Sequence, residues 1–151
     1  MRKLLILFCV IPCFVFGQQA ENTQKQESMY TNIADTLVSF VVNKKPESKI
    51  VFSADHFILD RIPDSFSGKE IEKTSRYKAI GKFSGFTWIR IEKFIVDQDR
   101  VFVFAKIQKQ ENDELKNWDN ESSNCKLTYH LNQTESTYEL IDFQAIKGVI
   151  K

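Results

Sequence analysis

Histidine, cysteine and glycine are scarce in this sequence, and their scarcity removes several chemistries. The 151 residues include three cysteines, five glycines and two histidines, His56 and His130. No C-x-x-C, H-x-x-H or H-E-x-x-H spacing occurs, so the sequence carries neither a structural zinc motif nor a zinc-hydrolase motif. The glycines form no G-x-G-x-x-G or phosphate-binding loop, and none frames a serine in the spacing of a nucleophile elbow. We therefore expect no metal and no cofactor.

An excess of charge of one sign is also lacking. The chain carries 21 lysine and arginine side chains against 20 aspartate and glutamate side chains, a net charge of +1. Removal of Arg2 and Lys3 with the N-terminal segment described next leaves 19 basic against 20 acidic side chains, a net charge of −1. A nearly neutral domain has no strong field that attracts nucleic acid or anionic lipid. We therefore expect no nucleic acid as a partner.

The one long apolar run lies at the N-terminus. Residues 1–3 are positively charged at Arg2 and Lys3, residues 4–16 are apolar, and Gly17 supplies a small residue for cleavage. This order is typical of a secretory signal peptide, and about 13 apolar residues are too few to span a bilayer as a permanent helix. The sequence predicts a signal peptide cut after Gly17 and a secreted or periplasmic protein that keeps no integral membrane segment.

The remaining chain has the size of one domain. Residues 18–27 are polar and are predicted to form a flexible leader. Residues 28–147 are predicted to form a single α+β domain, long enough to bury about two-thirds of its unfolded surface. Cys125 is the only cysteine left after cleavage, so no intrachain disulfide can form. It alternates with Leu127 and Tyr129, which favours a buried thiol over the alternative of intermolecular pairing.

An amphipathic helix opens the domain. Ser28 is the expected N-cap, and Pro46 follows the helix end behind basic residues. Apolar side chains recur at the spacings of three and four that define a helical stripe: Met29, Ile33, Leu37, Phe40 and Val41.

Three shorter segments complete the first half of the chain. The charged, helix-prone residues 68–77 are predicted to form a short second helix, and residues 57–59 a short strand. Residues 50–52 fit either the end of a helix or the start of a strand.

Two β-ribbons fill the rest of the domain. Residues 86–108 and 125–146 are rich in β-branched and aromatic side chains on either side of polar turns. The polar residues 111–124 between them are predicted to be a mobile connector. The sequence therefore predicts an α+β fold in which an N-terminal helix and a short second helix pack on a curved antiparallel sheet of four to six strands.

The first ribbon allows two registers that bury different side chains. A four-residue loop over residues 97–100 pairs Val96 with Val101 and Phe94 with Val103. One face then carries Trp88, Phe94, Val96, Val101, Val103, Ala105 and Ile107, and the other carries Ile89, Ile91, Ile95, Phe102 and Phe104. A three-residue loop would instead gather Ile89, Ile91, Ile95, Val101, Val103 and Ile107 opposite Arg90, Glu92, Lys106 and Gln108. We favour the first register, and the lack of Gly or Asn in the turn argues against a two-residue loop.

Four phrases in this order resemble the nuclear transport factor two superfamily, also called SnoaL-like. They are Ser53-Ala54-Asp55-His56-Phe57, Ser67-Gly68-Lys69-Glu70-Ile71, the run from Val96 to Val103, and Tyr138-Glu139-Leu140-Ile141-Asp142. The resemblance covers about residues 28 to 146 and implies a cone in which helices close the concave face of a curved sheet. It implies that the phrases mark a first strand, the start of a third helix, the central hairpin and the terminal strand. Isomerases, dehydratases and non-catalytic binding domains share this superfamily, so it constrains fold more than function.

One acid–base pair can be assigned from the sequence. Asp55 and His56 adjoin a predicted strand, and the resemblance implies Asp and His in the cavity of cone-shaped isomerases. They are the catalytic candidates for an isomerase, dehydratase or hydrolase. The candidates for lining a ligand cavity are Tyr77, Trp88, Arg90 and Tyr129.

The function expected first is binding without catalysis. Aromatic clusters build cores far more often than sites, and an exposed histidine is an ordinary surface residue. The protein is therefore predicted to be an exported domain that binds a small ligand or a protein. The second apolar face of the first ribbon further predicts a homodimer packed sheet to sheet.

Overall fold

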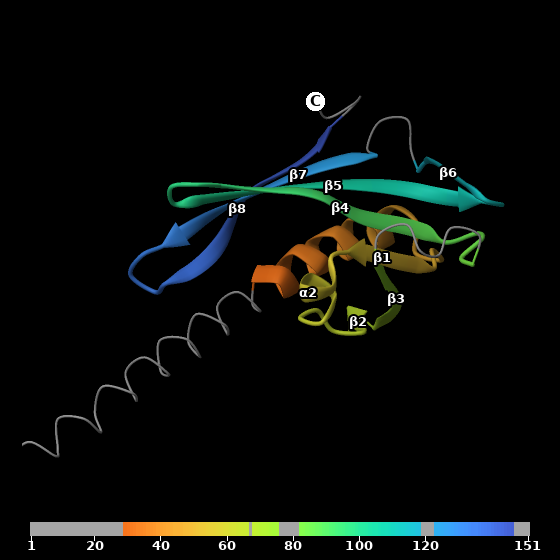
Figure 1. Cartoon of the computed structure of the whole chain (residues 1–151), viewed down its shortest axis with the longest axis horizontal. Helices are drawn as coiled ribbons and strands as arrows, with labels where there is room; N and C mark the ends of the chain where they lie inside the picture. The colour runs from red at the N-terminus through yellow and green to blue at the C-terminus, as the bar shows by residue number, and fades with distance from the viewer. Residues whose placement is uncertain (1–28, 67, 76–81, 119–122, 147–151) are drawn as a thin grey trace, which may run out of the picture.

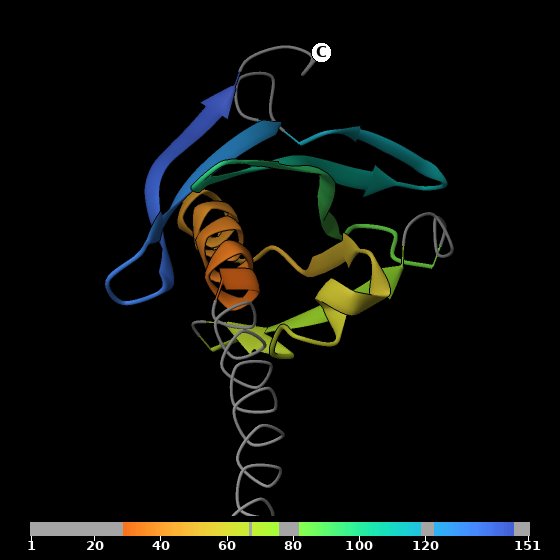
Figure 2. The same ribbon diagram turned by 60° about the vertical axis from the view of Figure 1, so that its left-hand side comes forward.

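The structure, a computed structural model, describes residues 29–66, 68–75, 82–118 and 123–146 (Figure 1). It shows a mixed α+β protein in which residues 29–44 form a first helix and an eight-stranded sheet curls around it (Figure 2). The α+β class and the curved sheet are confirmed, and the eight strands exceed the four to six predicted. The predicted signal peptide (1–17) and leader (18–27) lie outside the described residues.

The remaining elements follow the first helix in chain order. They are β1 (Ile50–Ala54), α2 (His56–Leu59), β2 (Ser65–Phe66), β3 (Lys69–Ser75), β4 (Thr87–Asp97), β5 (Arg100–Glu111), β6 (Glu114–Asn117), β7 (Asn124–Asn132) and β8 (Thr137–Ile146). The strand order is β2-β3-β1-β4-β5-β7-β8, and β6 pairs with the end of β5. Most pairs are antiparallel, as predicted. β1 is the exception, because it runs parallel to both β3 and β4.

The first helix lies in the hollow of the curled sheet (Figure 2). The predicted stripe faces the sheet, since Ile33, Leu37 and Val41 are each at most 1% exposed. The backbone N–H of Lys45 donates to the carbonyl of Val41 at 2.8 Å, which closes the last turn just before Pro46. The predicted helix is therefore confirmed, while its expected cap, Ser28, lies outside the described residues.

A β-bulge in β4 explains why two registers fitted the first ribbon. Near the turn, Val96 pairs with Val101 and Phe94 with Val103, so the favoured register is confirmed there. Between Ile91 and Lys93 the register shifts, and two residues of β4 oppose one of β5. The bulge moves every residue before it to the other face, which neither register had predicted.

The faces assigned before the bulge are therefore corrected. Ile89 pairs with Ile107 and is buried on the inner face against the first helix. Trp88, its neighbour, lies on the outer face, away from Phe94. The inner face of the ribbon comprises Ile89, Ile91, Phe94, Val96, Val101, Val103, Ala105 and Ile107, and Phe102 and Phe104 lie on the outer face with Ile95.

The turn of this ribbon is tighter than predicted. Asp97 still pairs with Arg100, so only Gln98 and Asp99 lie between the strands. Gln98 has φ 54°, and positive φ at the first central residue is the backbone requirement of a two-residue hairpin turn. The absence of Gly and Asn therefore did not exclude the two-residue turn, because Gln98 accepts a left-handed conformation that costs a non-glycine residue about 1–2 kcal/mol.

Three segments have a different secondary structure from the one predicted. Residues 57–59 belong to α2 rather than to a strand, and residues 69–75 form β3 rather than a helix. Residues 114–117 pair with β5 as β6, so this part of the predicted connector is ordered, and Trp118 beside it is buried. Residues 50–54 form β1, which settles the alternative left open for 50–52.

The second ribbon is confirmed. β7 and β8 pair along their lengths on either side of a turn over residues 133–136. The side-chain oxygen of Asn132 accepts hydrogen bonds from the backbone N–H groups of Thr134 at 3.1 Å and Glu135 at 3.3 Å, which fixes the turn. A register shift between Thr128 and Tyr129 leaves Ile141 of β8 as an extra residue.

Candidate functional site

The predicted acid–base pair lies on the surface. Asp55 occupies the N-cap position of α2 with extended backbone, and His56 is the first residue of that helix. Both side chains are exposed. Neither residue lines the pocket beside β3 or the smaller groove near the start of β1.

The predicted ligand residues are divided between the two faces of the sheet. Trp88 and Arg90 lie on the outer face, where the indole Nε1 of Trp88 donates to Oε1 of Gln110 at 2.8 Å. Arg90 contacts the carboxylate of Glu92 in the bulge. Tyr129 lies on the inner face within the main core, and Tyr77 lies outside the described residues. The structure therefore does not bring Tyr129 together with Trp88 and Arg90.

Tyr129 is a core residue whose hydroxyl is hydrogen-bonded to the first helix. Its hydroxyl donates to Oδ1 of Asn32 on the first helix at 2.8 Å, and the residue is 0% exposed. Burial raises the pKa of Tyr129, because the phenolate would lose its hydration. This hydrogen bond ties the first helix to β7 and satisfies the only polar atom of the ring.

The thiol of Cys125 is unreactive in the folded protein. It is buried on the inner face of β7, as its alternation with Leu127 predicted. Burial raises the pKa of its thiol to about 12, so the nucleophilic thiolate is not populated at neutral pH. His130 lies on the opposite face of β7 and contacts Asp99 at 2.8 Å. Cys125 and His130 therefore form no nucleophile–base pair.

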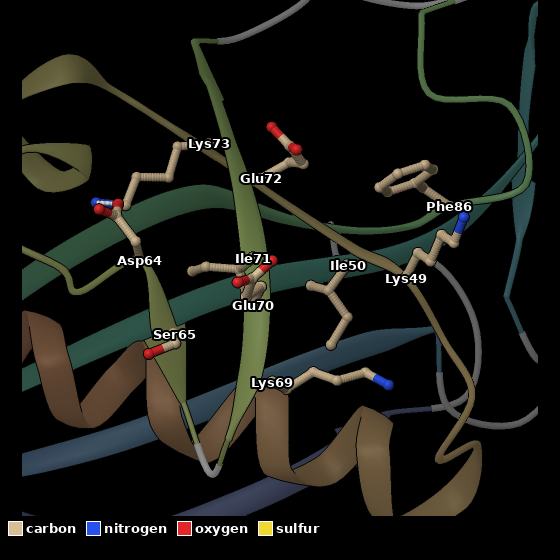
Figure 3. A pocket seen from close by; sticks show the side chains of 10 residues that line it. All are labelled: Lys49, Ile50, Asp64, Ser65, Lys69, Glu70, Ile71, Glu72, Lys73 and Phe86. Carbon is tan, nitrogen blue, oxygen red and sulfur yellow. Dashed lines mark ion pairs between the residues drawn. The ribbon is translucent and has the colours of Figure 1, made fainter.

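The larger pocket, of about 790 Å³, lies beside β3 (Figure 3). Lys73 and Asp64 lie together at one end of it, 2.6 Å apart, and Lys49 and Phe86 lie at the other end. Lys69 reaches the carbonyl of Pro46 at 2.6 Å. Three lysines and three acidic residues are among the ten residues that line the pocket. The ten are Lys49, Ile50, Asp64, Ser65, Lys69, Glu70, Ile71, Glu72, Lys73 and Phe86. This is an open, charge-balanced pocket with a small apolar floor.

An apolar patch lies on the outer face near the turn of the first ribbon. It consists of Ile95, Phe102 and Phe104, which are partly exposed on adjacent strands and belong to neither buried cluster. We call these three residues the outer patch. The favoured register of the first ribbon predicted all three on one face, and this is confirmed. Nζ of Lys126 on β7 lies 4.8 Å from the ring centroid of Phe102 and covers part of it.

The other end of the outer face is covered. Trp88 packs with Phe83 and Val51, and Phe86 and Leu115 lie against this cluster. The loop before β4 and the strand β6 therefore close the sheet there. The outer patch differs because no element among the described residues packs over it.

Comparison with known proteins returned no relative. No protein-family model matches the chain, and no curated protein or solved structure matches it significantly. Within residues 29–146, as far as they are described, no helix is long and apolar enough to cross a membrane. The described residues also contain no cluster of three or more metal-ligating side chains. The resemblance to the nuclear transport factor two superfamily stays a prediction.

Proposed function

We propose that the protein is an exported, non-catalytic binding domain that works as a homodimer, with two copies packed sheet to sheet through the outer patch. The observation that carries the proposal is the difference between the two ends of the outer face. Trp88 is 1% exposed beneath its cover, whereas Phe102 and Phe104 are partly exposed. Exposed aromatic side chains grouped on one face are typical of interaction sites.

A second copy of the chain fits the charges around the outer patch. Lys93 lies beside it on β4, and Asp142 lies on the far margin on β8, opposite Thr128 of β7. A two-fold axis parallel to the strands places β4 of one copy over β8 of the other. Each Lys93 then approaches the partner copy's Asp142, while the aromatic rings meet at the centre. Opposite charges at the margins and an apolar centre are the usual anatomy of an interface.

The absence of catalysis is proposed from the state of the reactive groups. Cys125 and Tyr129 are buried, with the pKa of each raised by loss of hydration. Asp55 and His56 are exposed at the start of α2, outside both pockets. Export is proposed from the N-terminal signal pattern, and the cone-like resemblance supports a binding role as well as an enzymatic one.

Sedimentation velocity of the mature chain, from residue 18, tests the dimer. We expect reversible dimerisation, with a dissociation constant on the order of micromolar to millimolar because the outer patch is small. Phe104→Glu should abolish it, since a carboxylate would be buried against the partner's rings. Phe57→Glu is the matched control, because Phe57 is 49% exposed on α2 and contacts Tyr30 on the inner side of the sheet, opposite the outer patch.

A charge exchange tests the geometry of the dimer. Lys93→Glu and Asp142→Lys should each weaken dimerisation, and the double variant should restore it, because the pairs reform with reversed sign. A chain that stays monomeric at about 1 mM would refute the homodimer. A dimer that tolerates Phe104→Glu would place the interface elsewhere.

A further inference from the structure

A second, smaller groove lies at the opposite end of the sheet from the outer patch. It has a volume of about 500 Å³ and lies between the start of β1, the turn before β4 and the end of β5. The residues that matter for its chemistry are Lys45, Glu47, Lys49, Ser84, Lys109 and Trp118. We call it the lysine groove. Its volume is within the range of about 300–1,000 Å³ of small-molecule sites.

The lysine groove has an excess of positive charge. Three lysines and one glutamate line it, which differs from the balanced pocket beside β3. Lys109 lies 3.3 Å from Glu111, but Lys116 contacts the same carboxylate at 2.9 Å, so one acidic group is shared between two lysines. The side chains that line the groove therefore leave positive charge uncompensated.

Aromatic rings, rather than carboxylates, hold two of these lysines. Nζ of Lys45 lies 5.0 Å from the centroid of the Trp118 ring, and Nζ of Lys49 lies 5.7 Å from that of Phe86. Nζ of Lys44 also approaches the Trp118 ring, at 5.7 Å. A cation–π contact restricts the ammonium group but adds no negative charge to neutralise it. The ammonium groups of Lys45 and Lys49 are thus held near the groove by rings that add no negative charge.

Trp118 contributes an unused hydrogen-bond donor. It is 5% exposed, and its indole Nε1 has no hydrogen-bond partner among the residues that the structure describes. A buried N–H group without an acceptor costs about 1–3 kcal/mol, and such groups are uncommon in folded proteins. Trp118 lines the lysine groove. An anion that enters beside the indole would provide the missing acceptor.

We infer that the lysine groove binds a small anion that carries at least two negative charges, either a phosphate ester or a di- or tricarboxylate. Lysine ammonium groups act as point charges and accept both chemistries. The lysine groove and the outer patch lie at opposite ends of the sheet. Anion binding in the groove can therefore be tested independently of the proposed dimer.

Titration of the ¹⁵N-labelled mature chain followed by heteronuclear NMR tests this site. Pyrophosphate and citrate are added separately at constant ionic strength. We expect saturable shifts in the backbone amides of Lys49, Ser84 and Thr87 and in the indole N–H of Trp118. A dissociation constant of about 0.1–5 mM is expected for an open groove that offers charge and few fixed donors. The tighter of the two ligands identifies the preferred head group, and either preference supports the site.

Matched variants separate this site from general attraction to lysines. Lys45→Gln with Lys49→Gln should weaken pyrophosphate binding at least tenfold, and both side chains are exposed, so the fold is expected to persist. Arg100→Gln with Lys106→Gln removes the same charge from two β5 positions that do not line the groove, and should leave binding unchanged. The inference is wrong if the two double variants bind alike, or if no shift saturates below about 20 mM, well above the affinity that such a site provides.

Discussion

The two faces of β5 can be compared residue by residue. Val103, Ala105 and Ile107 point to the inner face and are 0% exposed, whereas Phe102 and Phe104 between them point outward and are partly exposed. From Val101 to Ala105 the strand is apolar on both sides, so composition there does not decide which face is sealed. The first helix seals the inner face, and the outer face is sealed only where Phe83, Phe86 and Leu115 cover it.

This difference separates residues that stabilise the fold from residues available for binding. Close packing makes every methylene of a sealed face contribute to stability. A partly exposed face contributes less to folding, because its side chains leave water only in part when the chain folds. Substitutions on the two faces should therefore have opposite consequences for folding and for association.

The largest expected loss of stability follows a substitution on the inner face. Leu127→Ala removes a side chain that is 0% exposed beneath the first helix and should lower the free energy of unfolding by about 2–5 kcal/mol. Phe102→Ala on the outer face should lower it by less than about 1 kcal/mol, within the range of partly exposed sites. Urea unfolding at low protein concentration measures both. Equal losses would mean that the outer patch belongs to the core.

A smaller effect is expected at the covered end of the outer face. Trp88→Phe removes the donor to Gln110, whose side chain is 0% exposed, and leaves its oxygen without that partner. The loss should be about 1–3 kcal/mol of unfolding free energy. Addition of Gln110→Met to this variant should recover part of the loss, because no buried acceptor then remains. If the second substitution costs more stability, the hydrogen bond is not the main contribution of the pair.

The smallest effect concerns the pH dependence of the inner face. The pKa of Cys125 is about 12 when folded, against an ordinary value of 9.0. Between these values the unfolded chain has lost the thiol proton and the folded chain has kept it, so stability falls as pH rises above 9. The contribution is present in full below pH 9. Cys125→Ala should therefore show a shallower fall in unfolding free energy between pH 9 and 10.5, and identical slopes would contradict the buried thiol.

The helical stripe and both ribbons could be predicted because their apolar periods are long and are reinforced by packing. The period from Met29 to Val41 and the alternation around Leu127 point to the same faces that the tertiary structure buries. The bulge after Ile91 could not be predicted from alternation, because each register is correct on only one side of it. A period-two pattern cannot show where its own phase changes.

Local helix propensity led to the wrong prediction for residues 69–75, which form β3. Its lysines and glutamates favour a helix when the segment is considered alone, but Ile71 is buried and pairs with Ile50 of β1. A parallel partner about 20 residues away in the sequence determines the strand, and no pattern within residues 68–77 reveals it. Asp55, by contrast, carried the N-cap signal of α2, which the three apolar residues 57–59 obscured.

One candidate site could be predicted from the local sequence pattern, and the other could not. The outer patch was found from the sequence because its three side chains lie beyond the bulge, where the favoured register holds. The lysine groove was not found, since Lys45, Lys49, Lys109 and Trp118 come from separate segments that only the fold assembles. Tyr129 was expected beside Trp88, and the two lie on opposite faces because the bulge reverses Trp88.

The extra residue in β8 affects how this molecule would meet another sheet. β8 ends the strand order, so its outer edge offers backbone groups that a foreign strand could use. The irregularity at Ile141 divides that edge into residues 137–140 and residues 142–146. A strand that pairs in register with one of these segments would be out of register with the other. Irregularities of this kind discourage edge-to-edge pairing of sheets, and deletion of Ile141 is expected to leave an uninterrupted edge.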